Sequence, residues 1–265
     1  MAHNQTKVAV VSGATRGIGR DTANLLIADG YAVYGLSRKA GDDDRVSHIS
    51  CDVSVESDVQ SAIQQVVEKT GRIDLLVCNA GFGIAGAVEL TPVAQAESQM
   101  AVNFMGTFNC VKYALPALRK SKGRIVMISS AASAFPLPYQ AFYSASKSAV
   151  TALALGLRDE VKPHGVSVTV CLPGDVNTGF AEARHKHLED CEIYGSAPRR
   201  SVEQMERDEA NGMSSDYVAS KIYKMCVRKR VKPMYVIGTK YKVIFVAGKI
   251  FPTSFVRWCV GKVYG

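Results

Sequence analysis

Two side chains four residues apart, Tyr143 and Lys147, have the types and spacing for acid–base chemistry. They follow Ser129 and Ser130, which end the short apolar run 126–128. Residues 142–157 are good helix formers without proline, so the phenol and the ammonium would share one helix face. A nearby ammonium favours an ionised phenol, so we expect Lys147 to lower the pKa of Tyr143 from about 10. Such a tyrosine could donate a proton to a carbonyl, or accept one from an alcohol.

The Tyr-x-x-x-Lys spacing occurs a second time, at Tyr217 and Lys221, where no strand-end serine stands the same distance upstream. The spacing alone also fits a tyrosine stem packed on the core beside a solvated lysine. The remaining elements of the chain must therefore decide whether the first copy carries chemistry.

Length and composition indicate a soluble globular chain of 265 residues, 47% apolar and 21% charged. This length suits one large α/β domain or two small ones. No run approaches the roughly 18 apolar residues of a membrane span, and residues 1–6 lack the apolar length of a secretory signal. The seven cysteines show no metal-ligand spacing, so we expect no metal site and a reduced, cytoplasmic location.

Positive charge is concentrated at the C-terminal end. Residues 217–265 contain eleven Lys or Arg and no Asp or Glu. The whole chain carries +8, which leaves −3 for residues 1–216. The basic character therefore belongs to the last fifth of the chain.

A glycine turn between a strand and a helix predicts a dinucleotide-binding site. The β-branched run 7–12 is followed by Gly13, Gly17 and Gly19, and then by a helix pattern through residue 28. Glycines let the backbone approach a pyrophosphate, and the free N–H groups at a helix start hold it. A plain strand–helix turn is the alternative.

The end of the second strand, 31–36, indicates which dinucleotide is bound. Ser37 and Arg38 follow it, Arg16 lies in the glycine turn, and no acid occurs before Asp42. An NAD enzyme places a carboxylate here for the ribose hydroxyl, whereas an arginine suits a 2′-phosphate. We therefore expect NADP(H), although solvated basic side chains would give the same pattern.

Five further strands are expected at 46–51, 73–78, 122–130, 166–171 and 233–238. Asp52, after the first of these, could reach an adenine amino group or cap the helix 55–70, which Gly71 ends. The short polar segment 39–45 is expected to be a loop, as is the glycine-rich segment 82–87. A helix is expected from 92 to beyond 118, and it contains Asn103. Asparagine is disfavoured inside a helix, so we expect the Asn103 side chain to be hydrogen-bonded.

At this point the residues resemble those of the short-chain dehydrogenases/reductases, over essentially the whole chain. Ser12 and Cys78 stand where many members have threonine and asparagine, and Ser130 precedes Tyr143 by thirteen residues, as in the family. The matching pieces occur in the family's order: 12–19, Asp52, 78–81, Asn103, Ser130, Tyr143 with Lys147, and 173–178.

The resemblance implies one α/β domain over residues 1–265, a Rossmann-type doubly wound fold with a seven-stranded parallel sheet and helices on both faces. It also implies catalytic roles. Tyr143 would be the general acid/base, and Lys147 would lower its pKa and hold the nicotinamide ribose. Ser130 would bond the substrate oxygen, and Asn103 would hold a water in the proton path. The implied cofactor-binding residues are Ser12, Gly13, Thr15, Arg16, Gly17, Ile18, Gly19, Ser37, Arg38, Asp52, Val53, Asn79, Ala80, Gly81, Tyr143, Lys147, Pro173, Gly174, Val176 and Thr178.

The substrate end of the sequence is less specific. Residues 178–212 are expected to form a lid over the strand ends, and residues 131–139 an apolar wall without a cation. The expected lid side chains are Phe180, Leu188, Ile193, Tyr194 and Met205. This favours a neutral, hydrophobic secondary alcohol or ketone, and the stretch after Thr178 resembles the branch of hydroxysteroid and retinol dehydrogenases. The alternatives are a 3-oxoacyl (lipid) reductase and a non-catalytic NADP-sensing protein.

The basic segment 239–265 alternates apolar stretches with cations and is broken by Pro252. Such a segment could lie on an anionic membrane surface, cover the pocket mouth, contact a neighbouring subunit, or form a plainly packed helix. Its interleaved aromatic residues favour apolar packing over nucleic-acid binding. We expect a homodimer or homotetramer, with no nucleic-acid partner.

Overall fold

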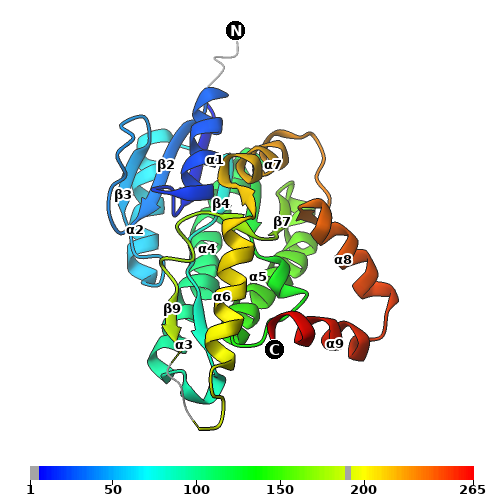
Figure 1. Ribbon diagram of the computed structural model, residues 1–265. Coiled ribbons are helices and arrows are strands. Elements are labelled where there is room, and N and C mark those ends of the chain that lie inside the picture. Colours follow the sequence, from blue (N-terminus) through cyan, green and yellow to red (C-terminus); the bar gives the residue numbers. More distant parts are fainter. Residues whose placement is uncertain (1–5, 189–191) are drawn as a thin grey trace.

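Seven parallel strands form the central sheet of the computed structural model, which describes residues 6–188 and 192–265 (Figure 1). The strand order is β11-β7-β6-β4-β1-β2-β3. All seven expected strands are confirmed: β1 Val8–Ser12, β2 Ala32–Ser37, β3 Ser47–Ser50, β4 Leu75–Cys78, β6 Arg124–Ile128, β7 Ser167–Pro173 and β11 Met234–Ile237. The central strands are buried along their length, as strands covered on both faces must be.

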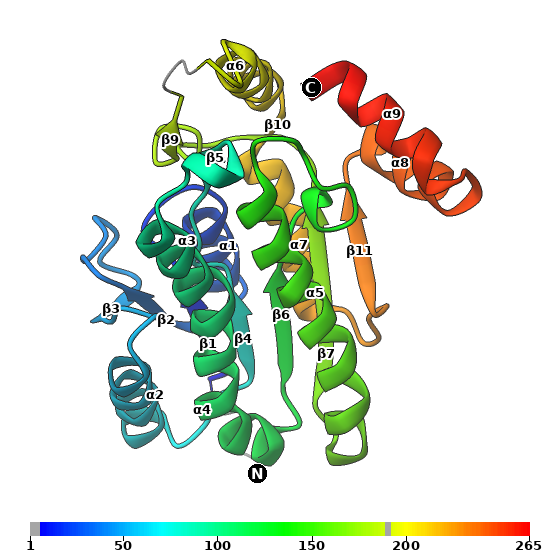
Figure 2. The same ribbon diagram turned by 90° about the horizontal axis from the view of Figure 1, so that it is seen from below.

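Helices cover both faces of the sheet, as the resemblance implied (Figure 2). On one face α1 Gly17–Ala28 packs beside α7 Ser215–Val227. On the other lie α2 Glu56–Thr70, α4 Gly106–Ser121 and α5 Ala141–Val161. Each face has its own cluster of buried apolar side chains, so the sheet separates two hydrophobic cores. The fold is therefore doubly wound, with the carboxyl ends of parallel strands meeting at one edge.

The helix expected from 92 to beyond 118 has a π-helical turn within it. It consists of α3 Val93–Met100, the π-helical turn Ala101–Met105, and α4. Asn103 lies in that turn and is fully buried. Such turns are frequent at functional sites, because the extra residue re-aims a side chain. By contrast α2 ends as expected, with Gly71 left-handed at φ 73°.

Short strands and one helix cover the carboxyl edge of the sheet. β5 Ile84–Gly86 pairs with β9 His185–His187, and β8 Val176–Asn177 pairs with β10 Met213–Ser214. The helix α6 Ala197–Ala210 lies between β9 and β10 in the sequence. The loop expected at 82–87 is thus partly a strand, because three residues are too few to show a period. Single 3₁₀ turns occur at Val88–Leu90, Ala131–Ser133 and Lys162–His164.

The basic C-terminal segment forms two helices, α8 Thr239–Ile250 and α9 Thr253–Tyr264, with the break at Pro252. They extend from the body beyond β11, and the end of α9 returns toward α6 (Figures 1 and 2). Within the two described stretches, no helix combines the length and apolar content needed to cross a bilayer.

Candidate active site and dinucleotide cleft

Tyr143 and Lys147 lie on α5 against the end of β6, where the chain continues into Ser130. The Lys147 Nζ donates to the Ile128 carbonyl at 2.9 Å and lies 6.0 Å from the centroid of the Tyr143 ring. The Ser130 side chain borders the same cavity as Tyr143 and partly opposes the effect of burial, which raises the pKa of the Tyr143 phenol. The structure therefore brings the three predicted catalytic groups together at one strand end.

The two adjacent serines have different surroundings. Ser129 is buried, and its Oγ donates to the Lys147 carbonyl at 2.8 Å. The Ser130 Oγ instead accepts from the Ala132 N–H at 3.1 Å and faces the cavity beside Tyr143. Ser129 thus ties β6 to the backbone of α5, and Ser130 is the serine available to a substrate.

The pKa of Tyr143 differs from the expectation. Burial raises it to about 12, and the hydrogen bond from Ser130 only partly opposes this. Burial also lowers the pKa of Lys147, to about 8. The expected lowering by Lys147 fails because loss of hydration dominates and the ammonium lies to one side, on the Ile128 carbonyl. At neutral pH the phenol therefore holds its proton, the form that a proton donor needs.

Asn103 has the hydrogen-bonded role that its helical position predicted. Its Nδ2 donates to the Phe82 carbonyl at 3.0 Å and to Ser146 Oγ at 2.9 Å, and its Oδ1 accepts from the Phe82 N–H at 3.0 Å. Its own carbonyl accepts from Thr107 Oγ1 at 2.8 Å. The side chain holds the loop after β4 against α5, and Asn103 does not line the cavity.

The glycine turn is held by contacts with the end of β4. Ser12 Oγ accepts from the N–H groups of Asn79 and Ala80 at 3.0 and 3.1 Å. The Asn79 Nδ2 donates to the carbonyls of Ser12 and Gly13. A Cβ on Gly19 would lie 2.1 Å from the Gly13 oxygen, so no larger residue fits there. Ser12 and Gly19 do not line the cavity, and they shape the turn from behind.

One cavity of about 1250 Å³ connects the glycine turn to the catalytic cluster. Ser12, Gly19 and Asn103 are the predicted site residues that do not line it. The predicted residues that do are Gly13, Thr15, Arg16, Gly17, Ile18, Ser37, Arg38, Asp52, Val53, Asn79, Ala80, Gly81, Ser130, Tyr143, Lys147, Pro173, Gly174, Val176 and Thr178. The cleft and the cluster are thus parts of one site.

Cations line the end of the cavity at β2. Arg16, Arg38 and Lys39 all border it, and the Ser37 Oγ is bonded to the Lys39 carbonyl at 2.8 Å. Asp52 lines it too, and its Oδ1 accepts from Ser54 N and Oγ at 2.9 and 2.6 Å. Burial alone would raise the pKa of Asp52, but the hydrogen bonds from Ser54 and the charge of Arg38 together lower it.

The substrate end contains both expected and unexpected side chains. Phe180 and Met205 line the cavity, and the Phe180 ring lies 5.5 Å from that of Tyr143. Leu188, Ile193 and Tyr194 do not line it. The sequence left open whether residues 239–265 cover the pocket mouth, and no motif marked which of their side chains would line the cavity. The helices α8 and α9 supply Lys240, Tyr241, Ile244, Val256, Cys259, Val260, Val263 and Tyr264.

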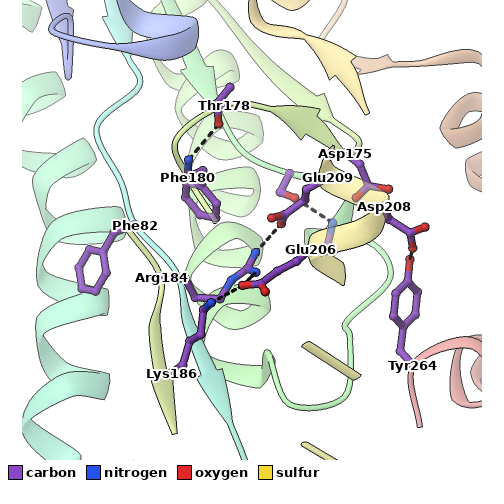
Figure 3. A network of polar contacts seen from close by, with 12 residues as sticks. Phe82, Asp175, Thr178, Phe180, Arg184, Lys186, Glu206, Asp208, Glu209 and Tyr264 are labelled. Atoms are coloured by element: carbon purple, nitrogen blue, oxygen red, sulfur yellow. Dashed lines mark hydrogen bonds and ion pairs between the residues drawn. The ribbon is translucent and has the colours of Figure 1, made fainter. Parts of the chain in front are cut away.

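A buried ion-pair network underlies this end of the cavity (Figure 3). The fully buried Arg184 pairs with Glu206 and Glu209, and Lys186 pairs with Glu206 at 2.5 Å. Burial raises the pKa of Glu209, although Arg184 opposes the shift. The network fixes β9 to α6, a buried arrangement that no sequence pattern predicted.

A different side of α6 from the one that carries Glu206 holds the C-terminal helices (Figure 3). The Tyr264 hydroxyl donates to Asp208 at 2.7 Å, and Ser201 Oγ donates to the Tyr264 carbonyl at 2.5 Å. Tyr241 donates to Asp175, which also lines the cavity. Burial raises the pKa of Asp175, and this hydrogen bond opposes it. The helices α8 and α9 are thus anchored at both ends to the segment that covers the cavity.

A family model described as short chain dehydrogenase matches residues 7–189. The chain is 36% identical to a 3-ketodihydrosphingosine reductase from Bacteroides thetaiotaomicron, with 98% of each chain covered. It is 35% identical to an 11-beta-hydroxysteroid dehydrogenase-like 2 protein from Arabidopsis thaliana, over 72% of this chain and 64% of that one. An alcohol dehydrogenase from Thermococcus sibiricus, solved with 5-hydroxy-NADP, superposes with a TM-score of 0.73 at 25% identity, covering 89% and 98% of the two chains.

Proposed function

The chain belongs to the short-chain dehydrogenase family, and from this premise we propose that it is an NADP(H)-dependent reductase of hydrophobic ketones, acting also on the corresponding secondary alcohols. The observation that carries the proposal is the single cavity in which Ser130, Tyr143 and Lys147 stand beside the glycine turn. A bound nicotinamide dinucleotide would supply or accept the hydride.

The chain's own residues handle the proton and the oxygen. Tyr143, protonated at neutral pH, donates its proton to the carbonyl oxygen of the substrate. Ser130 directs its single O–H at the same oxygen and stabilises the charge that develops there. Lys147, a cation below its pKa of about 8, would bind the nicotinamide ribose. Asn103 acts as a positioning residue, since its side chain is bonded to Phe82 and Ser146.

The cavity residues fit a dinucleotide phosphate. Gly13 and Gly17 take left-handed φ values of 68° and 51°, so the turn leaves backbone N–H groups at the start of α1 for a pyrophosphate. Arg16 and Arg38 would bind the 2′-phosphate, and the Thermococcus sibiricus protein, with its NADP analogue, supports this choice.

The substrate side favours a long apolar ketone, the kind of lipid substrate named for the Bacteroides thetaiotaomicron reductase. Support comes from the apolar wall Ala131, Ala132, Phe135 and Leu137, together with the apolar side chains of α8 and α9. The segment 131–139 contributes no cation to the cavity, as expected, but Lys240 of α8 borders the cavity as well. A hydroxysteroid remains a second candidate, favoured by the likeness to the Arabidopsis thaliana protein.

The direct test is a panel of steroid, retinoid and long-chain acyl ketones, followed by NADPH absorbance. Turnover should be fastest with a long-chain ketone and faster with NADPH than with NADH. Failure of the whole panel, or equal use of NADH, would overturn the corresponding part of the proposal.

A matched pair of arginines tests the cofactor assignment. Arg38→Ala should raise the KM for NADPH roughly 10- to 100-fold by removing a charge-assisted hydrogen bond, and leave the KM for NADH nearly unchanged. Arg45 is the control, because Asp43 holds it outside the cavity in an ion pair of 2.7 Å. An equal effect of Arg45→Ala would contradict a specific role for Arg38.

We further propose that the chain forms a homo-oligomer and contacts a membrane peripherally through residues 239–265. The absence of acidic residues from 217 to 265 supports the second point.

A further inference from the structure

The helix α9 has two apolar faces, which is unusual for a helix on the outside of a soluble protein. One face carries Val256, Cys259, Val260 and Val263, and these side chains line the cavity. The other carries Phe251, Phe255 and Trp258 from the start of the helix and the residues before it. These three rings form a continuous row, with centroids 5.1 and 6.0 Å apart.

The outer row is exposed to solvent. Phe251, Phe255 and Trp258 are 50%, 46% and 60% exposed, and Val243, Val246 and Ile250 of α8 are exposed as well. An apolar surface of this kind marks a partner or a membrane. Its position on two helices that project from the body leaves it accessible (Figure 2).

Four residues of α8 and α9 that line the cavity are also exposed to solvent: Lys240, Ile244, Cys259 and Val263. Ile244 and Val263 are 37% and 56% exposed. The cavity therefore reaches the outer surface of the molecule at the helix pair α8–α9, where Lys240 is the one charged residue among these four.

The charge around the exposed row decides which occupant fits. The segment 239–265 carries five cations and no acid, and Lys262 lies 6.0 Å from the Trp258 ring. A second copy of the same face would bring ten positive charges together, so self-association there is disfavoured. Exposed aromatic rings on a segment that also carries lysines suit an anionic bilayer. The rings would lie in the membrane interface and the ammonium groups at the lipid phosphates.

We propose that α8 and α9 dock on an anionic bilayer by the row Phe251, Phe255 and Trp258, and that a membrane-dissolved ketone passes between Ile244 and Val263 into the cavity. The inference rests on the proposed ketone reductase and its membrane contact, and it adds the side chains that make that contact and the route of the substrate. The face with the aromatic row contacts the lipid, and the face that lines the cavity contacts the apolar part of the ketone substrate.

The test uses the full chain and compares vesicles of phosphatidylcholine alone with vesicles that also contain phosphatidylserine. The chain should sediment with the mixed vesicles, less with the neutral ones, and less at high salt. The double variant Phe255→Asp with Trp258→Asp should bind the mixed vesicles roughly tenfold more weakly or worse, because it removes two large apolar side chains from the contact. The control Phe108→Asp alters an aromatic residue of α4 that is 36% exposed, and should bind as the wild type does.

Turnover distinguishes docking from a structural effect. The double variant should reduce a short, water-soluble ketone within about twofold of the wild type, but lose most of its rate on a long-chain ketone carried in vesicles. A wild type that reduces the soluble ketone yet ignores vesicles would overturn the inference and leave the reductase intact. Vesicle binding without turnover of either ketone would overturn delivery to a reductase. Equal losses on both ketones, or a changed subunit count in ultracentrifugation, would overturn it in favour of folding or self-association.

Discussion

The chain contains the Tyr-x-x-x-Lys spacing twice, and the two copies differ in what surrounds them. In α7 the Lys221 ammonium lies 4.5 Å from the centroid of the Tyr217 ring, closer than the 6.0 Å between Lys147 and the ring of Tyr143. Yet Tyr217 is 42% exposed at the surface, whereas Lys147 is only 5% exposed. Closeness within the pair therefore does not make a site.

The difference lies in the neighbouring strand end. The carbonyl of Ile128 accepts a hydrogen bond from the Lys147 ammonium, and Ser130, Tyr143 and Lys147 all border the cavity. The surface pair borders no part of that cavity. The Tyr-x-x-x-Lys spacing forms a candidate site only where the end of a strand places a serine and a cavity beside it.

The largest expected effect comes from removing the phenol. Tyr143→Phe should lower kcat roughly 10³-fold, because it removes the hydroxyl that donates the proton, and NADPH binding should persist. Tyr217→Phe, the matched change in the other copy, should leave turnover unaltered. Steady-state rates and a fluorescence titration with NADPH measure both. Turnover of Tyr143→Phe within tenfold of the wild type would break the distinction.

The next effect separates two adjacent serines. Ser130→Ala should lower kcat roughly 10²-fold through loss of a donor to the developing oxyanion. Ser129→Ala should instead cost about 1 kcal/mol of unfolding free energy, since its Oγ bonds only α5, and leave most of the turnover. Kinetics and urea unfolding of the two variants give the comparison. Equal kinetic losses would show that strand-end burial, not the hydroxyl facing Tyr143, decides the rate.

The smallest effect is a pH dependence of stability. Burial lowers the pKa of Lys147 from 10.5 to about 8, so between these values the unfolded chain binds more protons than the folded one. The contribution of this group to stability therefore rises with pH from about 8 to 10.5. Lys147→Met removes that contribution, so the wild type should gain stability relative to the variant over this range.

Urea unfolding at several pH values measures this difference, with Lys221→Met as the matched control. A pH dependence in the control as large as in Lys147→Met would show that the buried amine is not its source. Turnover at neutral pH should fall in Lys147→Met but not in Lys221→Met. A lysine that is only buried, without a role in the reaction, would not give this difference.

The sequence by itself determined the sheet and the glycine turn, and it predicted which side chains would meet at the end of β6. Strands such as β1 and β4 are nearly all apolar, and the turn residues Gly13 and Gly19 admit no larger side chain, so local chemistry leaves few alternatives. The positions of Ser130 and Asp52 followed because parallel strands end at one edge.

Only the tertiary structure decided how the substrate end is built. Ile244 and Val263 reach the cavity from the last 27 residues, and Arg184 is buried between acids of α6, by contacts that have no sequence period. The pKa of Tyr143 also belongs to the fold, because burial depends on every element packed around the ring rather than on a lysine four residues away. Spacing along a helix is local information, whereas desolvation and the closing of a cavity arise only from the packing of distant segments.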